Sequence, residues 1–191
     1  MGDPRKLRSK FEGPSHPWQA ERIEAEKVLL QEYGLKNKRE LNRLISKGKT
    51  YTSTAKRLIA SSGSQADLEK QQLFDTLHKF GLIIGSTNLD DVLGLQTKAL
   101  LERRLQTLLF RKGYARTMSQ SRQFISHTHV FVGGKKITSP GYLVSVTEES
   151  SIAIDPSSSL ANVEHPERVA IKKKVKKFRP PKRDFRRGGR R

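Results

Sequence analysis

Three signals follow one another in the middle of the chain and constrain the fold more than any other part of the sequence. From Thr97 onward, leucines recur at helical spacing and predict an amphipathic helix that stops at Gly113. Thr117 with Gln120 three residues later is a capping box and predicts the start of a second helix. Gly133-Gly134 predicts a two-residue hairpin turn, because both glycines tolerate a positive φ.

Short strands are expected after the second helix. That helix should end near His127, with Phe124 and Ile125 packed on the leucines of the first. The apolar pattern then predicts short strands over 129–132, 135–137, 142–146 and 152–154. Two helices followed by a small antiparallel sheet would form one compact unit.

The first hundred residues are expected to be helical. Apolar residues at helical spacing predict helices over 18–33, 38–46, 52–60, 64–80 and 89–93. Gly48 should end the second of these helices, and Ser64 should cap the fourth together with Asp67. The predicted fold class is therefore α+β, mainly helical at first and followed by a small two-helix and short antiparallel sheet module.

Four segments are expected along the chain. They are a basic N-terminal arm over 1–17, a helical region over 18–102, the helix-and-sheet module over 103–164 and a basic extended tail over 165–191. Prolines and glycines in both end segments favour extended backbone over helix.

Positive charge dominates the chain and is concentrated at its end. The formal net charge is +19, from 38 Lys and Arg against 19 Asp and Glu. Between Arg168 and Arg191, 13 basic residues stand against one acid, Asp184. Such a charge repels itself and is most easily tolerated beside a polyanion, so nucleic acid is the first candidate partner. Anionic membrane is the second candidate, and an ordinary enzyme with excess surface lysine is the third. For the tail alone, a basic segment that only keeps the protein soluble is the alternative.

Several classes of protein are excluded by composition. Without cysteine the chain has neither disulfides nor cysteine-liganded zinc. No apolar run approaches the ~20 residues of a membrane helix, so a cytoplasmic protein without a membrane partner is expected. His127 and His129 could share one face of a strand, but no third ligand lies nearby, and no metal, cofactor or small-molecule substrate is expected.

Polar and basic residues of the predicted module are candidates for binding RNA. Arg104 and Arg111 lie seven residues apart and should face outward together, where arginine binds phosphate in bidentate fashion. Thr117 marks a helix start, which attracts anions, although its main role should be the cap itself. The full set of candidates is Arg103, Arg104, Arg111, Arg116, Thr117, Arg122, Gln123, His127, Lys135 and Lys136.

The run RLQTLLFRKGYARTMSQSRQFISHTHVFVGGKKITSPGYLV, residues 104–144, resembles the RNA-binding module named after small-subunit ribosomal protein S-four. The sequence departs from the usual pattern at Ser121, Thr128 and Gly133, where alanine, glycine and asparagine are common. The positions that match are Arg104, Leu105, Gly113, Ala115, Thr117, Arg122, Gln123, His129, Val132, Gly134 and Pro140.

The resemblance extends beyond the module. The start MGDPRKLRSKFEGPSHPW and the triplet Tyr33-Gly34-Leu35 look like the archaeal and eukaryotic branch of the S-four family, and the modest length favours an archaeal source. This implies a non-enzymatic structural constituent of the cytoplasmic ribosome. It would bind small-subunit rRNA early in assembly and adjoin small-subunit proteins such as S-five.

Other RNA-related functions remain open. A free RNA-binding factor that associates with ribosomes could carry the same module, and so could an accessory subunit of an RNA-modifying enzyme. A DNA-compacting protein would also suit the charge.

Overall fold

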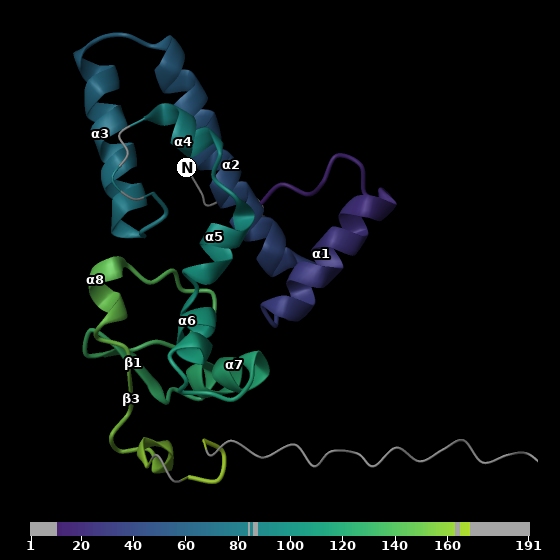
Figure 1. Ribbon diagram of the computed structural model, residues 1–191, viewed down its shortest axis with the longest axis vertical. Helices are drawn as coiled ribbons and strands as arrows, with labels where there is room; N and C mark the ends of the chain where they lie inside the picture. Colours follow the sequence, from purple (N-terminus) through teal and green to yellow (C-terminus); the bar gives the residue numbers. More distant parts are fainter. Residues whose placement is uncertain (1–10, 84, 86–87, 163–164, 169–191) are drawn as a thin grey trace, which may run out of the picture.

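The computed structural model describes residues 11–83, 85, 88–162 and 165–168 (Figure 1). Most of the predicted N-terminal arm and nearly all of the predicted basic tail therefore lie outside the described residues.

One long helix organises the N-terminal region. Helix α2 contacts α1, α3, α4 and α5, and these helices form the upper part of Figure 1. Helix α2 is central because its buried residues face the other helices. These residues are Leu41, Leu44, Ala55 and Leu58. The five helices are α1 (Ala20–Glu32), α2 (Lys38–Ala60), α3 (Ser64–Lys79), α4 (Leu89–Leu93) and α5 (Thr97–Glu102).

Two expectations about these helices are wrong. Gly48 does not end a helix, because α2 runs through it and replaces the two helices predicted over 38–46 and 52–60. Packing on both sides of the glycine outweighs its cost of about 1 kcal/mol within a helix. The cap of α3 is Gly63 rather than Ser64, which is the first residue of that helix.

The module adds three short helices, a 3-10 turn and a small sheet. Strand β1 lies in the middle of the antiparallel order β2-β1-β3, with Val132 opposite Lys135 and Val130 opposite Ile154. The Gly133-Gly134 hairpin is confirmed, with φ of 56° and 75°. The elements are α6 (Leu105–Arg111), α7 (Met118–Ser126), β1 (Val130–Val132), β2 (Lys135–Lys136), α8 (Val146–Glu149), β3 (Ala153–Ile154) and η1 (Ser159–Ala161).

The helix predicted from Thr97 to Gly113 is broken in the middle, and the strand predicted over 142–146 does not form. At the break, Leu105 N–H donates to Tyr142 O at 2.8 Å, and Val144 N–H donates to Arg103 O at 3.0 Å. The backbone after Ser139 therefore pairs with the break between α5 and α6 instead of joining the sheet. A capping box then turns the chain into α8.

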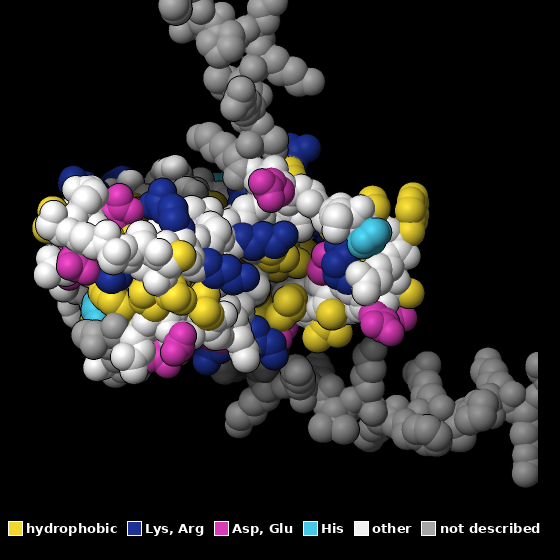
Figure 2. Space-filling model, turned by 90° about the horizontal axis from the view of Figure 1, so that it is seen from above, with side chains coloured by type: hydrophobic (Ala, Val, Ile, Leu, Met, Phe, Trp, Pro, Cys, Tyr) yellow, Lys and Arg dark blue, Asp and Glu magenta, His cyan; other side chains and the backbone are white. Residues whose placement is uncertain are grey.

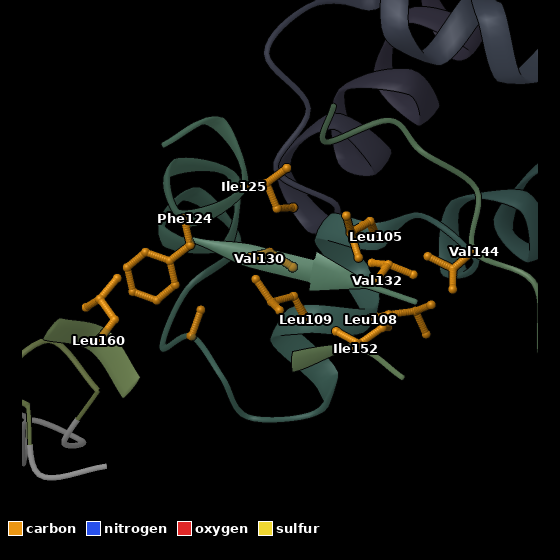
Figure 3. Close-up of a cluster of buried hydrophobic side chains, with 11 residues drawn as sticks. Leu105, Leu108, Leu109, Phe124, Ile125, Val130, Val132, Val144, Ile152 and Leu160 are labelled. Atoms are coloured by element: carbon orange, nitrogen blue, oxygen red, sulfur yellow. The ribbon is translucent and has the colours of Figure 1, made fainter. Parts of the chain in front are cut away.

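The apolar core of the module lies between α6, α7 and the sheet (Figure 3). Phe124 and Ile125 of α7 pack with Leu105 and Leu109 of α6, as predicted. Val130 extends the same cluster to β1 and is fully buried. The predicted fold class, α+β, is confirmed.

The turn between α1 and α2 connects the helical region to the module. Gly34 O accepts a hydrogen bond from Gln106 Nε2 of the module at 3.1 Å, and Tyr33 Oη donates to Glu102, the last residue of α5, at 2.8 Å. Gly34 has a φ of 56°, and a Cβ at this position would lie 2.7 Å from Cβ of Met118. Glycine thus permits both the turn and the close approach.

Gly34→Ala should lower the free energy of unfolding by more than the ~1–2 kcal/mol that a left-handed backbone costs, because the new Cβ also clashes with Met118. Gly113→Ala is the matched control, because Gly113 has a φ of 76° and an added Cβ there would meet no neighbouring atom within 4 Å. Urea denaturation of both variants measures the difference, and equal losses would contradict the close approach.

Gly48→Ala should instead raise the free energy of unfolding. Its Cβ would lie 3.4 Å from Cδ1 of Leu100, an ordinary contact, within a continuous helix. Alanine is favoured over glycine there by roughly 0.5–1 kcal/mol. A rise of that size in the same denaturation experiment is expected, whereas destabilisation would indicate that glycine is needed for packing.

Candidate nucleic-acid interface

The start of α7 has the predicted cap in a shifted form. Thr117 Oγ1 accepts from Gln120 N–H at 3.1 Å, which confirms its role as the cap. The Gln120 side chain reaches one residue further than in a capping box and accepts from Arg116 N–H at 2.8 Å. Thr117 and Gln123 are exposed. The positive end of the helix therefore meets the surface at Thr117, which suits an anion such as phosphate.

Two of the predicted RNA-binding arginines are bound to one glutamate of the helical region. Arg122 lies in a bidentate pair with Glu40, at 2.6 and 3.1 Å, and Arg104 Nη2 contacts the same carboxylate at 3.0 Å. Only 2% of the Arg104 side chain is exposed, so the expectation that it faces outward with Arg111 is wrong. We call these three residues the Glu40 cluster.

Charge and hydrogen bonding keep Glu40 ionised. Burial raises its pKa, but hydrogen bonds from Arg122 and Arg104, together with their charges, outweigh burial and hold the pKa below its usual value. Burial lowers the pKa of Arg104, and Glu40 opposes that shift. The break after Arg103 matters here, because Arg104 sits at the start of α6 and points toward α2.

Arg103 and Arg111 also have acidic partners. Arg103 bonds Glu149 at 2.7 Å and Val144 O at 3.1 Å, and its side chain is 14% exposed. Arg111 is 56% exposed and pairs with Glu102, which also accepts from Tyr33 Oη. Burial, followed by this hydrogen bond, raises the pKa of Tyr33 to about 12.

The hairpin carries two lysines with different surroundings. Lys136 lies 2.8 Å from Asp155 and 5.3 Å from the centre of the Phe131 ring. The hydrogen bond with Lys136, followed by those from Ser157, lowers the pKa of Asp155 to about 2. Lys135 is exposed at the tip.

The two histidines stack on one another at the end of α7. Their ring centroids are 6.3 Å apart, and His129 Nδ1 lies 3.0 Å from Ser158 Oγ. His127 is exposed and follows the last residue of α7, so the two residues do not share a strand. In the described part of the chain, no three His, Asp or Glu side chains gather as metal ligands.

Comparison with known proteins identifies the family. Residues 103–150 match the S4 domain. A protein of Methanococcus maripaludis strain C5 named "Small ribosomal subunit protein uS4" is 46% identical over 171 residues, covering 89% of this chain and 96% of the relative. The chain belongs to the uS4 family. Relatives of the same name from Methanococcus aeolicus and Methanococcus vannielii are 46% and 44% identical over 170 residues, covering 88% of this chain and 96% of each. These sources are archaeal, as the resemblance implied.

The candidate residues of this uS4 chain fall into two groups. Arg103, Arg104 and Arg122 face neighbouring carboxylates, and Arg122 keeps 26% of its side chain exposed. The remaining candidates, here called the outer group, include Arg111 and Lys136, which also pair with carboxylates but are more than half exposed. The group consists of Arg111, Arg116, Thr117, Gln123, His127, Lys135 and Lys136. Seen from the α2–α3 end, Lys and Arg side chains also gather in a band across the molecule (Figure 2).

Sequence reasoning missed Glu40 and the basic residues of α2. Asn37 caps α2 by accepting from Glu40 N–H, and an asparagine three residues before a glutamate signals a helix start. That signal gives no sign of the two arginines 64 and 82 residues further along.

Among the described helices, none is long and apolar enough to cross a bilayer.

Glu40→Gln should lower the free energy of unfolding by about 3 kcal/mol, because it leaves Arg104 buried without a counter-charge. Glu69→Gln is the control, since Glu69 pairs with the exposed Arg57 at 2.7 Å and should cost about 1 kcal/mol or less. Equal losses in denaturant unfolding would refute a structural role for the cluster.

The stabilisation from Glu40 should depend on pH. Its folded pKa lies below the usual 4.5, so the contribution is complete above that value and is lost as the pH falls through the folded pKa. The difference in unfolding free energy between the wild type and Glu40→Gln should therefore be large at neutral pH and shrink in acid. A difference independent of pH would contradict the ionised pair.

Proposed function

We propose that this uS4-family chain is a structural component of the small ribosomal subunit and binds small-subunit rRNA directly. The observation that carries the proposal is the 46% identity to a protein named as small-subunit uS4, over 171 residues that include both the helical region and the module. No catalytic step belongs to this role.

The outer group offers the chemistry that folded RNA requires. Duplex RNA presents phosphates and 2′-hydroxyls in a wide minor groove, so proteins recognise it largely by shape. The exposed start of α7, at Thr117, can bind a phosphate, while the exposed Gln123 further along the helix can donate to a 2′-hydroxyl and Lys135 at the hairpin tip makes less directional contacts. Arg111 and Lys136 can exchange a carboxylate partner for phosphate, since both are more than half exposed.

The Glu40 cluster supports a different role for Arg104 and Arg122. Arg104 is too buried to reach a phosphate and acts by fixing α2 against the module. Arg122 does the same through its bidentate pair, and its exposed part can still approach RNA. The two arginines thus hold the basic surfaces of both regions in one geometry.

The family supports the wider setting of this function. A small-subunit protein resides on the ribosome, and we infer that it binds its rRNA early and contacts neighbouring proteins such as S-five. A free factor would bind the same RNA but would leave the particle when charge interactions are weakened.

Tagged chain expressed in an archaeal host should sediment with small subunits on sucrose gradients and remain there after a high-salt wash. A free factor would be washed off, which would overturn the structural role.

With purified chain and an rRNA transcript, log K should fall with log salt at a slope of roughly −5 to −7 if about eight phosphates are bound.

Lys135→Gln should weaken this binding and make the salt slope shallower by about one, because one phosphate contact is lost. The control is Lys70→Gln on α3, where Lys70 pairs with Asp67 at 3.2 Å. Identical slopes for the two variants would remove Lys135 from the interface.

A further inference from the structure

A recess of about 250 Å³ opens where the end of α3 meets the segment before α8. Gly81 makes this junction possible: its φ is 61°, and a Cβ there would lie 2.9 Å from Cγ2 of Val146. The walls include Lys47, Lys79, Phe80 and Tyr142, so residues from the helical region and the module share the recess. None of these four is among the RNA-binding candidates found from the sequence.

Two aromatic rings line this recess. Phe80 is partly exposed and belongs to none of the three hydrophobic clusters formed by the described residues, so core packing does not explain it. Tyr142 is also partly exposed, and its Oη donates to Glu148 at 3.0 Å. Partly exposed rings in an open recess are suited to stacking against a planar group such as a base.

The rim of the recess is positively charged. Lys47 and Lys79 are exposed, and neither forms an ion pair with a carboxylate in the described part of the chain. Lys47 Nζ lies 5.6 Å from the centre of the Phe80 ring, and its flexible side chain can reach a phosphate instead. Arg39, Arg43 and Lys47 follow one another every four residues along α2, so a row of exposed cations leads to the recess.

Glu148 also lines the recess and adds a negative charge to it. The hydrogen bond that its carboxylate accepts from Ser145 N–H is the largest effect on its pKa and lowers it, and the charge of Lys79 lowers it further. A carboxylate repels a bare phosphate but accepts a hydrogen bond from the amino group of a base. Exposed cations beside aromatic rings and a carboxylate acceptor match one nucleotide better than an isolated anion.

We propose that this recess holds one unstacked nucleotide of the bound RNA. Its base lies against Phe80 and Tyr142, Glu148 accepts from an exocyclic amino group, and Lys47 and Lys79 contact the flanking phosphates. The inference rests on the proposed rRNA binding and adds to it a site for a base outside the duplex.

Phe80→Ala should weaken binding to a small-subunit rRNA transcript roughly five- to 150-fold, the range for losing one stacked base. The matched control is Phe110→Ala, a 37% exposed phenylalanine on α6 outside the recess, which should leave affinity unchanged. Thermal unfolding should be little affected by Phe80→Ala, since Phe80 is outside the core clusters. The salt slope should stay constant for this variant and become shallower by about one for Lys47→Gln or Lys79→Gln.

A fluorescent variant tests stacking directly. The chain has one tryptophan, Trp18, which is 91% exposed, so Trp18→Phe combined with Phe80→Trp places the only indole at the recess. This variant should keep its RNA affinity, and the transcript should quench its emission.

The outcomes separate the two proposals. If the wild type binds but Phe80→Ala matches Phe110→Ala and the indole is not quenched, the nucleotide site is refuted and rRNA binding stands. Such a result would favour a protein side chain as the occupant. If the wild type fails to bind the transcript at moderate salt, the proposed function fails and the site fails with it.

Discussion

The arrangement of the molecule depends on one carboxylate between two guanidinium groups. Glu40 lies near the start of α2, whereas Arg104 and Arg122 belong to the module. Because Arg104 is buried, the charge of Glu40 is needed to offset its desolvation, and the two regions are fixed to each other by that requirement. The Gly34 turn packs against Met118 and Gln106 and is a second contact that holds the helical region on the module.

This arrangement separates the cations of a strongly basic chain into two roles. Those of the Glu40 cluster hold the helical region on the module, while exposed cations such as Lys135 are the ones proposed to meet a polyanion. The row of cations along α2, Arg39, Arg43 and Lys47, also depends on the packing of the two regions. Lys47 lines a recess whose other wall includes Tyr142 of the module. The proposed RNA-binding surface, which spans both regions, therefore depends on the ionic contact between them.

Local signals in the sequence predicted much of the fold. Thr117 capped α7, Gly133-Gly134 formed the hairpin, and Phe124 and Ile125 entered the core, since each depends on neighbouring residues or on periodicity. The failures share a cause in distant contacts. Gly48 stayed helical because α2 packs along its whole length, and the helix from Thr97 broke because the backbone of 142–144 pairs with Arg103–Leu105. For the site, the sequence predicted which residue types would bind RNA but not which arginines would be buried.

By itself, the sequence determined the excess of positive charge, the helix-and-hairpin module and the resemblance to the S-four family, because composition, capping and turn residues act over a few positions. Only the tertiary structure decided that Arg104 and Arg122 meet Glu40, and that Phe80 and Tyr142 line one recess. Those pairs are separated by more than sixty residues, and their contact depends on how helices pack in space, which no local pattern encodes.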